Sequence, residues 1–175
     1  RSSVPALRGS ARPAARRTPR APLVTRALST ARILSLLPSA TEIVGGLGLT
    51  HRLVGVTHEC DKAPTAEALE ALLADGVERC TTSDIDLALP QGEIDRLVKA
   101  SIHADGPGSL YGVDADAVRR AAPGVVLTQN LCGVCAPAEA ATIEACADLD
   151  VQPTIVNLAP HDVAGVADSF LHVAE

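Results

Sequence analysis

Short runs of apolar residues alternate along the chain with longer segments of mixed polarity. The apolar runs are typical of strands buried on both faces of a sheet, and they lie at 33–37, 53–57, 125–128 and 154–158. The segments between them predict helices, at 65–75, 90–103, 114–122 and 137–149. A last helix is expected to begin at Asp162 and to continue to Glu175.

The segment that follows the first apolar run carries a signal for the start of a helix. Ser39 is followed three residues later by Glu42, which is the spacing of a capping box. The sequence therefore predicts a helix from this point to about Leu47, with Gly48 as its stop. The amides of the first turn are suited to holding an anion or a polar ligand, unless Ser39 and Glu42 satisfy them.

The order of these elements predicts an α/β protein, a three-layer parallel sheet with helices on both faces and right-handed crossovers. Ligands of such sheets bind at the carboxyl ends of the strands. Three polar segments directly follow predicted strands, at 38–42, 58–61 and 129–135. We expect all three at one edge of the sheet, where the last two emerge from neighbouring strands and form a common wall.

Residues that can bind a metal are concentrated in two of these segments. His58 and Cys60 belong to a His-Glu-Cys-Asp sequence, and Cys132 and Cys135 form a Cys-x-x-Cys pair between a strand and a helix. One imidazole and three thiolates suit a tetrahedral zinc ion. The Cys-x-x-Cys pair is equally the pattern of a redox dithiol, and buried cysteines also serve as inert packing residues.

The two remaining cysteines, Cys80 and Cys146, are expected to pack in the core. Five cysteines are an odd number, so the sequence does not predict a complete disulfide framework.

Charge is distributed very unevenly along the chain. Residues 1–32 contain eight arginines and no acid, whereas the remainder carries a net charge of −14. Residues 1–31 are also rich in Ser, Ala and Pro, which is typical of a transit peptide for a plastid or mitochondrion. A disordered basic tail has the same composition.

The composition of the chain excludes two classes of function, and residues 33–175 are the acidic part. With one Tyr and one Phe it lacks both the positive surface and the stacking rings that nucleic-acid binding needs. The sequence also contains no run of about 18 apolar residues, so no membrane span is predicted.

Four motifs occur in an order that resembles the cobalamin and iron-siderophore substrate-binding proteins of ABC importers. They are Arg32–Val44, Val54–Asp61, Ser109–Asp114 and Val125–Cys135. The resemblance implies two α/β lobes joined by a long helix, with the ligand bound between the lobes. By that template residues 32–160 are the N-terminal ligand-binding lobe, residues 161–175 are the start of the connecting helix, and the second lobe is absent.

The resemblance also implies what the protein does. Its members capture a ligand without chemistry, outside the cytoplasm, and deliver it to an ABC permease, so we expect no enzymatic activity. The expected ligand is cobalamin or another metal chelate. The resemblance assigns ligand contacts to Ser39, Thr41, His58, Glu59 and Tyr111. His58, Cys60, Cys132 and Cys135 would hold a metal, either zinc or the cobalt of a corrin.

Two other interpretations remain open at this stage. A thiol–disulfide oxidoreductase, or a zinc-binding protein, would use Cys132 and Cys135. A truncated gene product would have no independent function.

Overall fold

The computed structural model describes most of the chain after residue 30. The described residues are 31–60, 70, 72–83, 85–86, 88–103, 110–130, 137 and 139–175. The basic segment 1–30, most of the predicted helix 65–75, and both Cys132 and Cys135 lie outside them.

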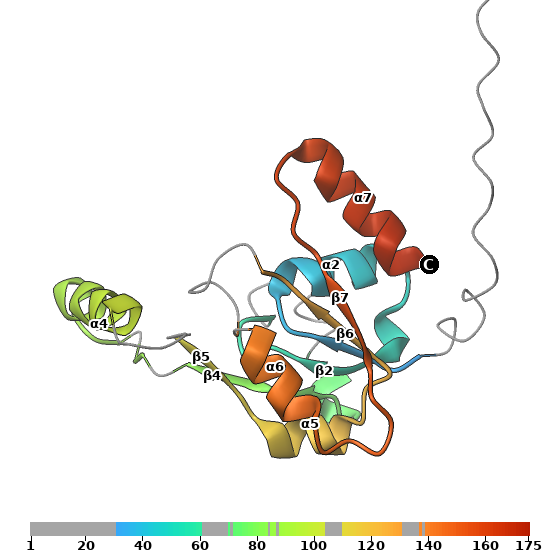
Figure 1. Ribbon diagram of the computed structural model, residues 1–175, viewed down its shortest axis with the longest axis horizontal. Coiled ribbons are helices and arrows are strands. Elements are labelled where there is room, and N and C mark those ends of the chain that lie inside the picture. The colour runs from blue at the N-terminus through green and yellow to red at the C-terminus, as the bar shows by residue number, and fades with distance from the viewer. Residues whose placement is uncertain are drawn as a thin grey trace, which may run out of the picture.

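A sheet of five strands forms the centre of the molecule (Figure 1). Its strands are β1 (Ile33–Ser35), β2 (Leu53–Val56), β3 (Glu78–Arg79), β6 (Val125–Thr128) and β7 (Thr154–Asn157). They lie in the order β3-β2-β1-β6-β7, and every pairing is parallel. The four predicted strands are therefore confirmed, and the short β3 extends the sheet by one.

Helices cover both faces of this sheet, which confirms the predicted three-layer α/β fold (Figure 1). One face carries α2 (Pro38–Gly46) and α7 (Val163–Ala174), and the other carries α5 (Ala115–Ala121) and α6 (Glu139–Cys146). Alternation along β6 divides the core, because Val125 and Leu127 pack toward α2 while Val126 packs toward α5. Apolar burial on both faces is what requires the strands to be almost continuously hydrophobic.

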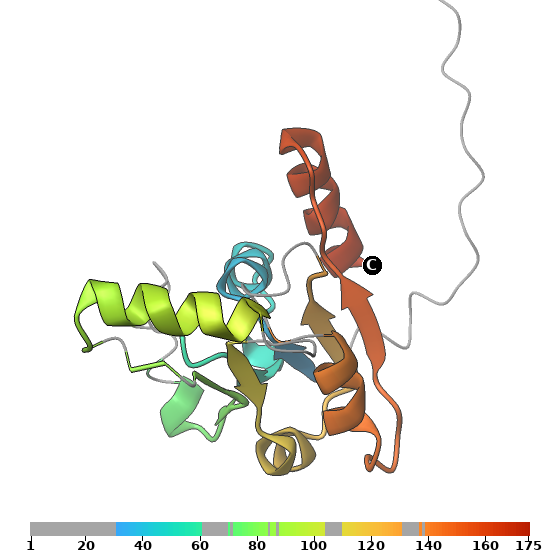
Figure 2. The same cartoon turned by 60° about the vertical axis from the view of Figure 1, so that its left-hand side comes forward.

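A second, smaller sheet was not predicted. Strands β4 (Thr81–Ser83) and β5 (Tyr111–Val113) pair antiparallel, with Thr81 opposite Val113 and Ser83 opposite Tyr111. Backbone hydrogen bonds attach it to the large sheet, since the Cys80 amide donates to the Val56 carbonyl at 2.9 Å. Helix α4 (Gln91–His103) extends beyond this small sheet, to the side of the three layers (Figure 2).

Several helix starts agree with the sequence, and two do not. Asp114 caps α5 by accepting from the Ala117 amide at 3.0 Å, and Asp162 caps α7 by accepting from the Gly165 amide at 2.7 Å. Helix α6 begins at Glu139, two residues later than predicted, so Pro137 lies before the helix.

The predicted capping box at Ser39 and Glu42 is wrong. Leu37 is the N-cap of α2, no side chain caps the helix, and Pro38 is its first residue. Proline suits this position because its ring fixes φ near the helical value and it has no amide hydrogen to leave unsatisfied. Ser39 therefore lies inside the first turn, exposed to solvent.

Within the described part of the chain, no helix combines the length and the apolar character needed to cross a bilayer.

Candidate functional site

The strand order defines where a ligand is expected to bind. The chain adds β2 and β3 on one side of β1 and later adds β6 and β7 on the other side. The order therefore reverses between β1 and β6, and the crevice at the carboxyl ends of such a strand pair is the usual ligand site in open α/β sheets. The segments after β1, β2 and β6 all begin at this carboxyl edge, as the sequence predicted.

The two segments that carry the candidate metal ligands do not follow neighbouring strands. Strand β1 lies between β2, which leads to His58, and β6, which leads to Asn130. The ends of β2 and β6 are therefore two strand spacings apart, roughly 10 Å. A wall shared by the segments after β2 and β6 would therefore have to include the start of α2, because α2 follows β1 and β1 lies between the other two strands.

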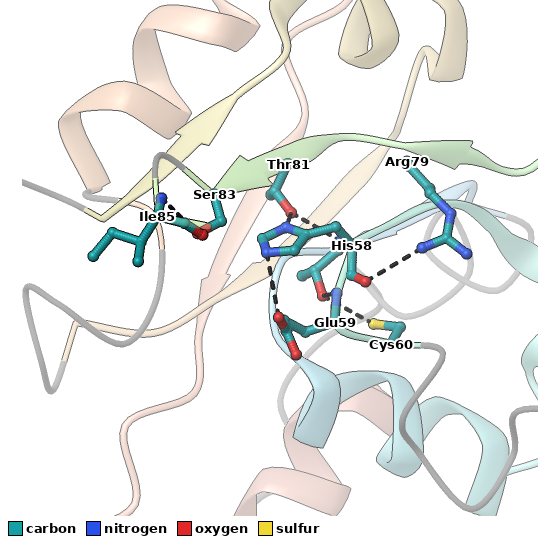
Figure 3. A network of polar contacts seen from close by, with 8 residues as sticks. His58, Glu59, Cys60, Arg79, Thr81, Ser83 and Ile85 are labelled. Atoms are coloured by element: carbon teal, nitrogen blue, oxygen red, sulfur yellow. Dashed lines mark hydrogen bonds and ion pairs between the residues drawn. The ribbon is translucent and has the colours of Figure 1, made fainter. Parts of the chain in front are cut away.

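His58 is held firmly just beyond the end of β2 (Figure 3). Its Nδ1 lies 2.7 Å from the Thr81 hydroxyl, and its own backbone amide donates to the same oxygen at 3.1 Å. The guanidinium of Arg79 donates to the His58 carbonyl at 3.3 Å. The hydrogen bond that fixes the imidazole therefore comes from Thr81 of β4, which is distant from His58 in the sequence.

Two further side chains surround the imidazole. The ring of Tyr111, on β5, is tilted against it with 5.4 Å between centroids. On the other side, a Glu59 carboxylate oxygen lies 3.5 Å from His58 Nε2. Nε2 is buried and has no hydrogen-bond partner in the described residues, so the contact with Glu59 is electrostatic only. Three of the predicted ligand contacts, His58, Glu59 and Tyr111, are thus brought together.

Cys60 faces the interior and not the carboxyl edge. It is fully buried, and its sulfur lies 3.1 Å from the Thr41 hydroxyl and 3.3 Å from the Thr57 hydroxyl. Thr41 is buried as well, and its hydroxyl donates to Ser35 Oγ at 2.9 Å. The Thr41 hydroxyl therefore links α2 to β1 and to the segment after β2, and its ligand contact stays a prediction.

The predicted metal set of His58, Cys60, Cys132 and Cys135 is divided by the structure. The His58 ring and the Cys60 thiol contact different threonines, and no cluster of three or more His, Cys, Asp or Glu residues suited to a metal ion occurs in the described residues. Cys132 and Cys135 lie outside those residues, so the complete set of four ligands stays a prediction.

The middle of the carboxyl edge is polar and accessible. Ser39 is exposed in the first turn of α2, directly after β1. Beyond β6, the Asn130 amide donates to Asn157 Oδ1 and its side chain donates to Glu139, both at 3.0 Å. These bonds connect the ends of β6 and β7 to the start of α6, so this part of the carboxyl edge is ordered by side-chain amides.

A hollow of about 430 Å³ continues this edge beyond β7. It lies between the segment after Asn157 and one side of α7, and it is lined by His161, Asp168 and Ser169 among others. The hollow is on the β7 side of the crevice, whereas His58 is on the β2 side.

Cys80 and Cys146 pack in the core as predicted. Burial raises the pKa of the Cys80 thiol to about 12, with a further contribution from the Glu78 carboxylate, and burial also raises the pKa of Cys146. Both thiols are therefore protonated at neutral pH and are unsuited to nucleophilic or redox chemistry.

The chain was compared with known proteins. No family model matches the sequence, and no curated protein is significantly similar to it. The structure is similar to the periplasmic vitamin B12 binding protein BtuF of Vibrio cholerae, with a TM-score of 0.50 and 19% identity over 83% of this chain and 41% of BtuF. The chain therefore has the fold of part of that protein. This agrees with the predicted fold class, a single α/β lobe, and the chain spans less than half the length of BtuF.

The structure is also similar to a variant of the heme binding protein HmuT. Its TM-score is 0.49 with 20% identity, over 83% of this chain and 34% of HmuT.

Sequence reasoning missed the residues that organise the site. Thr81 and Thr57 bond the side chains of His58 and Cys60; Thr57 lies within the motif Val54–Asp61, where no role was expected of it, and Thr81 lies in none of the four motifs. The available signal was weak, because Thr81–Ser83 is a run of only three residues with moderate strand propensity. Its partner strand is 28 residues further along the chain, so local pattern could not reveal the pairing.

Proposed function

We propose that this chain is a non-catalytic ligand-binding domain, and that its ligand is a corrinoid such as cobalamin or another metal chelate. One observation carries the proposal: the polar segments after β1, β2 and β6 share the carboxyl edge at which the strand order reverses. The similarity in fold to a vitamin B12 binding protein supports this ligand class, as does the resemblance of the four sequence motifs.

In this proposal, different residues contact different chemical groups of the ligand. The exposed Ser39 and the positive end of the α2 dipole suit the amide or carboxylate groups that surround such a chelate. The ring of Tyr111 would supply apolar contact, and His58 beside it would supply a polar one. Thr41 and Cys60 would support these groups from the interior.

Absence of catalysis is part of the proposal. The thiols in the described residues are all buried, and the His58 ring bonds a threonine and no thiol. We further propose delivery of the ligand to an ABC permease. Location in an organelle is proposed on the composition of residues 1–31 alone.

Direct titration tests the proposal. The purified chain is titrated with aquacobalamin, cyanocobalamin, ferric protoporphyrin IX and zinc, and binding is followed by absorbance and calorimetry. Saturable binding of at least one corrinoid or porphyrin at one equivalent is expected. Because the residues of this chain would contact only part of the surface of so large a ligand, we expect a Kd in the micromolar range, roughly 1–100 μM.

Two variants locate the site. Ser39→Arg places a bulky charge at the exposed start of α2 and should weaken binding without affecting folding. Asp150→Arg is the matched control, because Asp150 is exposed at the end of the sheet opposite the crevice. Equal affinity of both variants for the chelate, or no binding of any chelate by the unmodified chain, would contradict the proposal.

A further inference from the structure

A cavity of about 180 Å³ lies under the last turns of α7. Its floor is the face of the central sheet that also carries α2, near the starts of β1 and β6, and the short helix η1 (Thr50–Arg52) contributes to its wall. The crevice of the candidate site is at the opposite, carboxyl end of these strands. The cavity is therefore separate from the candidate site.

The inner walls of the cavity are aliphatic. Ile33, Val125 and Leu127 are buried core residues, and the half-buried Val156 and Val173 pack against the same cluster. None of these five side chains carries a hydrogen-bonding group. A water molecule inside a protein needs two to four polar partners, so these walls favour an apolar guest over water.

The composition of the chain explains why its own side chains leave this space. Large aromatic side chains and flexible methionines are the residues that fill irregular gaps in a core, and the chain contains one Phe, one Tyr, no Trp and no Met. The one phenylalanine, Phe170, lies against α2, where a Cβ at Gly46 would be 3.6 Å from its ring carbon Cε1. Around the cavity, β6, β7 and α7 present valines, which are short.

The side of the cavity that faces solvent carries charges of both signs. Arg52 is half-buried at the end of η1, and Glu175 and His172 are exposed on the last turn of α7. A cation and an anion at the same opening largely cancel each other's field, so neither a positive nor a negative guest is attracted. A charged guest would also lose its hydration against the aliphatic walls, which is costly.

We propose that this cavity is a second binding site, and that it takes one small neutral apolar molecule with the size of a six-membered ring. An apolar cavity of about 150 Å³ stays dry and binds benzene, and this cavity is slightly larger. The guest gains dispersion contacts with walls that otherwise face empty space. The inference does not rest on the proposed function, because it concerns the other end of the sheet.

The position of the cavity gives the guest an effect on the fold. Val173 belongs to α7 and Leu127 to β6, so a guest between them contacts both the last helix and the central sheet. A molecule that binds only the folded state raises stability by mass action. Occupancy should therefore strengthen the packing of α7 on the sheet.

Benzene is the probe that tests the site, with the full chain in solution. Nuclear Overhauser contacts are expected between benzene and the methyl groups of Leu127, Val156 and Val173. The methyl groups of Val163, which is 86% exposed at the start of α7, should show none. A guest of six heavy atoms can bind only weakly, so we expect saturation with a Kd of roughly 0.1–10 mM and a matching rise in the midpoint of thermal unfolding.

Two valine substitutions locate the guest. Val156→Phe places a ring in the cavity and should weaken benzene binding at least about tenfold, whereas Val163→Phe makes the same change at an exposed position and should leave the affinity unchanged. If Val156→Phe does not fold, Val173→Leu is the second variant, since its smaller addition narrows the cavity and should weaken binding severalfold. Equal affinity of the folded cavity variant and Val163→Phe would overturn the inference.

Benzoate tests the chemical class of the guest. It has the same ring with one negative charge, and it should bind at least about tenfold more weakly than benzene because the carboxylate must lose its hydration. Equal binding of the two would contradict a neutral guest. Absence of contacts between benzene and the cavity methyl groups in the unmodified chain would overturn the site itself.

Discussion

The hydroxyl of Thr41 lies 3.1 Å from the sulfur of Cys60, and both groups are buried. This contact joins α2 to the segment after β2, across the interior side of the candidate site. The same hydroxyl donates to Ser35 at the end of β1. One threonine thus connects the two strand ends that lie nearest to Ser39 and His58.

Replacing Thr41 by valine should destabilise the protein without a specific effect on ligand binding. The substitution keeps the shape but leaves the Ser35 hydroxyl and the Cys60 thiol without this partner, and such losses cost about 1–3 kcal/mol. Urea unfolding measures the change, and Thr41→Ser, which retains the hydroxyl, is the control. If Thr41→Val instead lost chelate affinity at unchanged stability, the result would show that Thr41 contacts the ligand.

Gly55 on β2 should not tolerate a side chain. A Cβ at this position would lie 2.7 Å from Leu34 Cδ1 and 2.8 Å from Cys80 Sγ, and all three residues are buried. Gly55→Ala therefore overpacks the core between the sheet and α5, and we expect a loss of about 1–3 kcal/mol.

Gly92 provides the matched control for that substitution. It lies in α4, and a Cβ added there would meet nothing within 4 Å. Gly92→Ala should be stabilising by about 0.5–1 kcal/mol, because alanine is the better helix former. Equal effects of the two substitutions in urea unfolding would show that the packing around Gly55 is looser than these distances indicate.

The parallel sheet could be predicted because its strands are buried on both faces. Val125–Thr128 is buried at every position, so a continuous apolar run had to be a central strand. The helices that follow were recognisable by Asp114 and Asp162, whose side chains bond amides in the first turn. Burial and capping are local properties, and they leave a clear trace in the sequence.

The interior of the candidate site could be predicted only in part. The resemblance assigns His58 and Tyr111 to the same ligand, and the two rings lie against each other in the structure. The role of Thr81 depends on a pairing between β4 and β5, which is long-range, and the position of Cys60 depends on two threonines from different elements. Polar contacts between distant segments carry no periodic signal, so sequence pattern does not reveal them.

Glu78 and Arg120 should make stability depend on pH. The Arg120 guanidinium donates two hydrogen bonds of 3.0 Å to Glu78, and this bonding holds the pKa of that carboxyl below its usual value of 4.5. A lowered pKa in the folded state means that the stabilisation is present above pH 4.5 and is lost as the pH falls through the lower value. Glu78→Gln should thus be slightly less stable than the unmodified chain at neutral pH, and the difference should disappear in acid.

The size of that difference should be small because the pair is at the surface, where solvent screens it. Thermal unfolding across a pH series provides the measurement, with Asp95→Asn as the control for removal of an exposed acid that pairs along one helix. The prediction would be contradicted if the difference in stability between Glu78→Gln and the unmodified chain became larger in acid.

Removal of Cys132 and Cys135 should leave a protein whose thiols do not react while it is folded. The remaining cysteines, Cys60, Cys80 and Cys146, are all buried, and burial raises the pKa of the last two. Reaction of the Cys132→Ser/Cys135→Ser variant with a disulfide reagent near pH 8 should be at least about tenfold slower in buffer than in urea, because the thiolate is the reactive form. Fast reaction in buffer would contradict the packing of these cysteines. Fast reaction of the unmodified chain alone would assign the reactive thiol to Cys132 or Cys135, which the oxidoreductase interpretation requires.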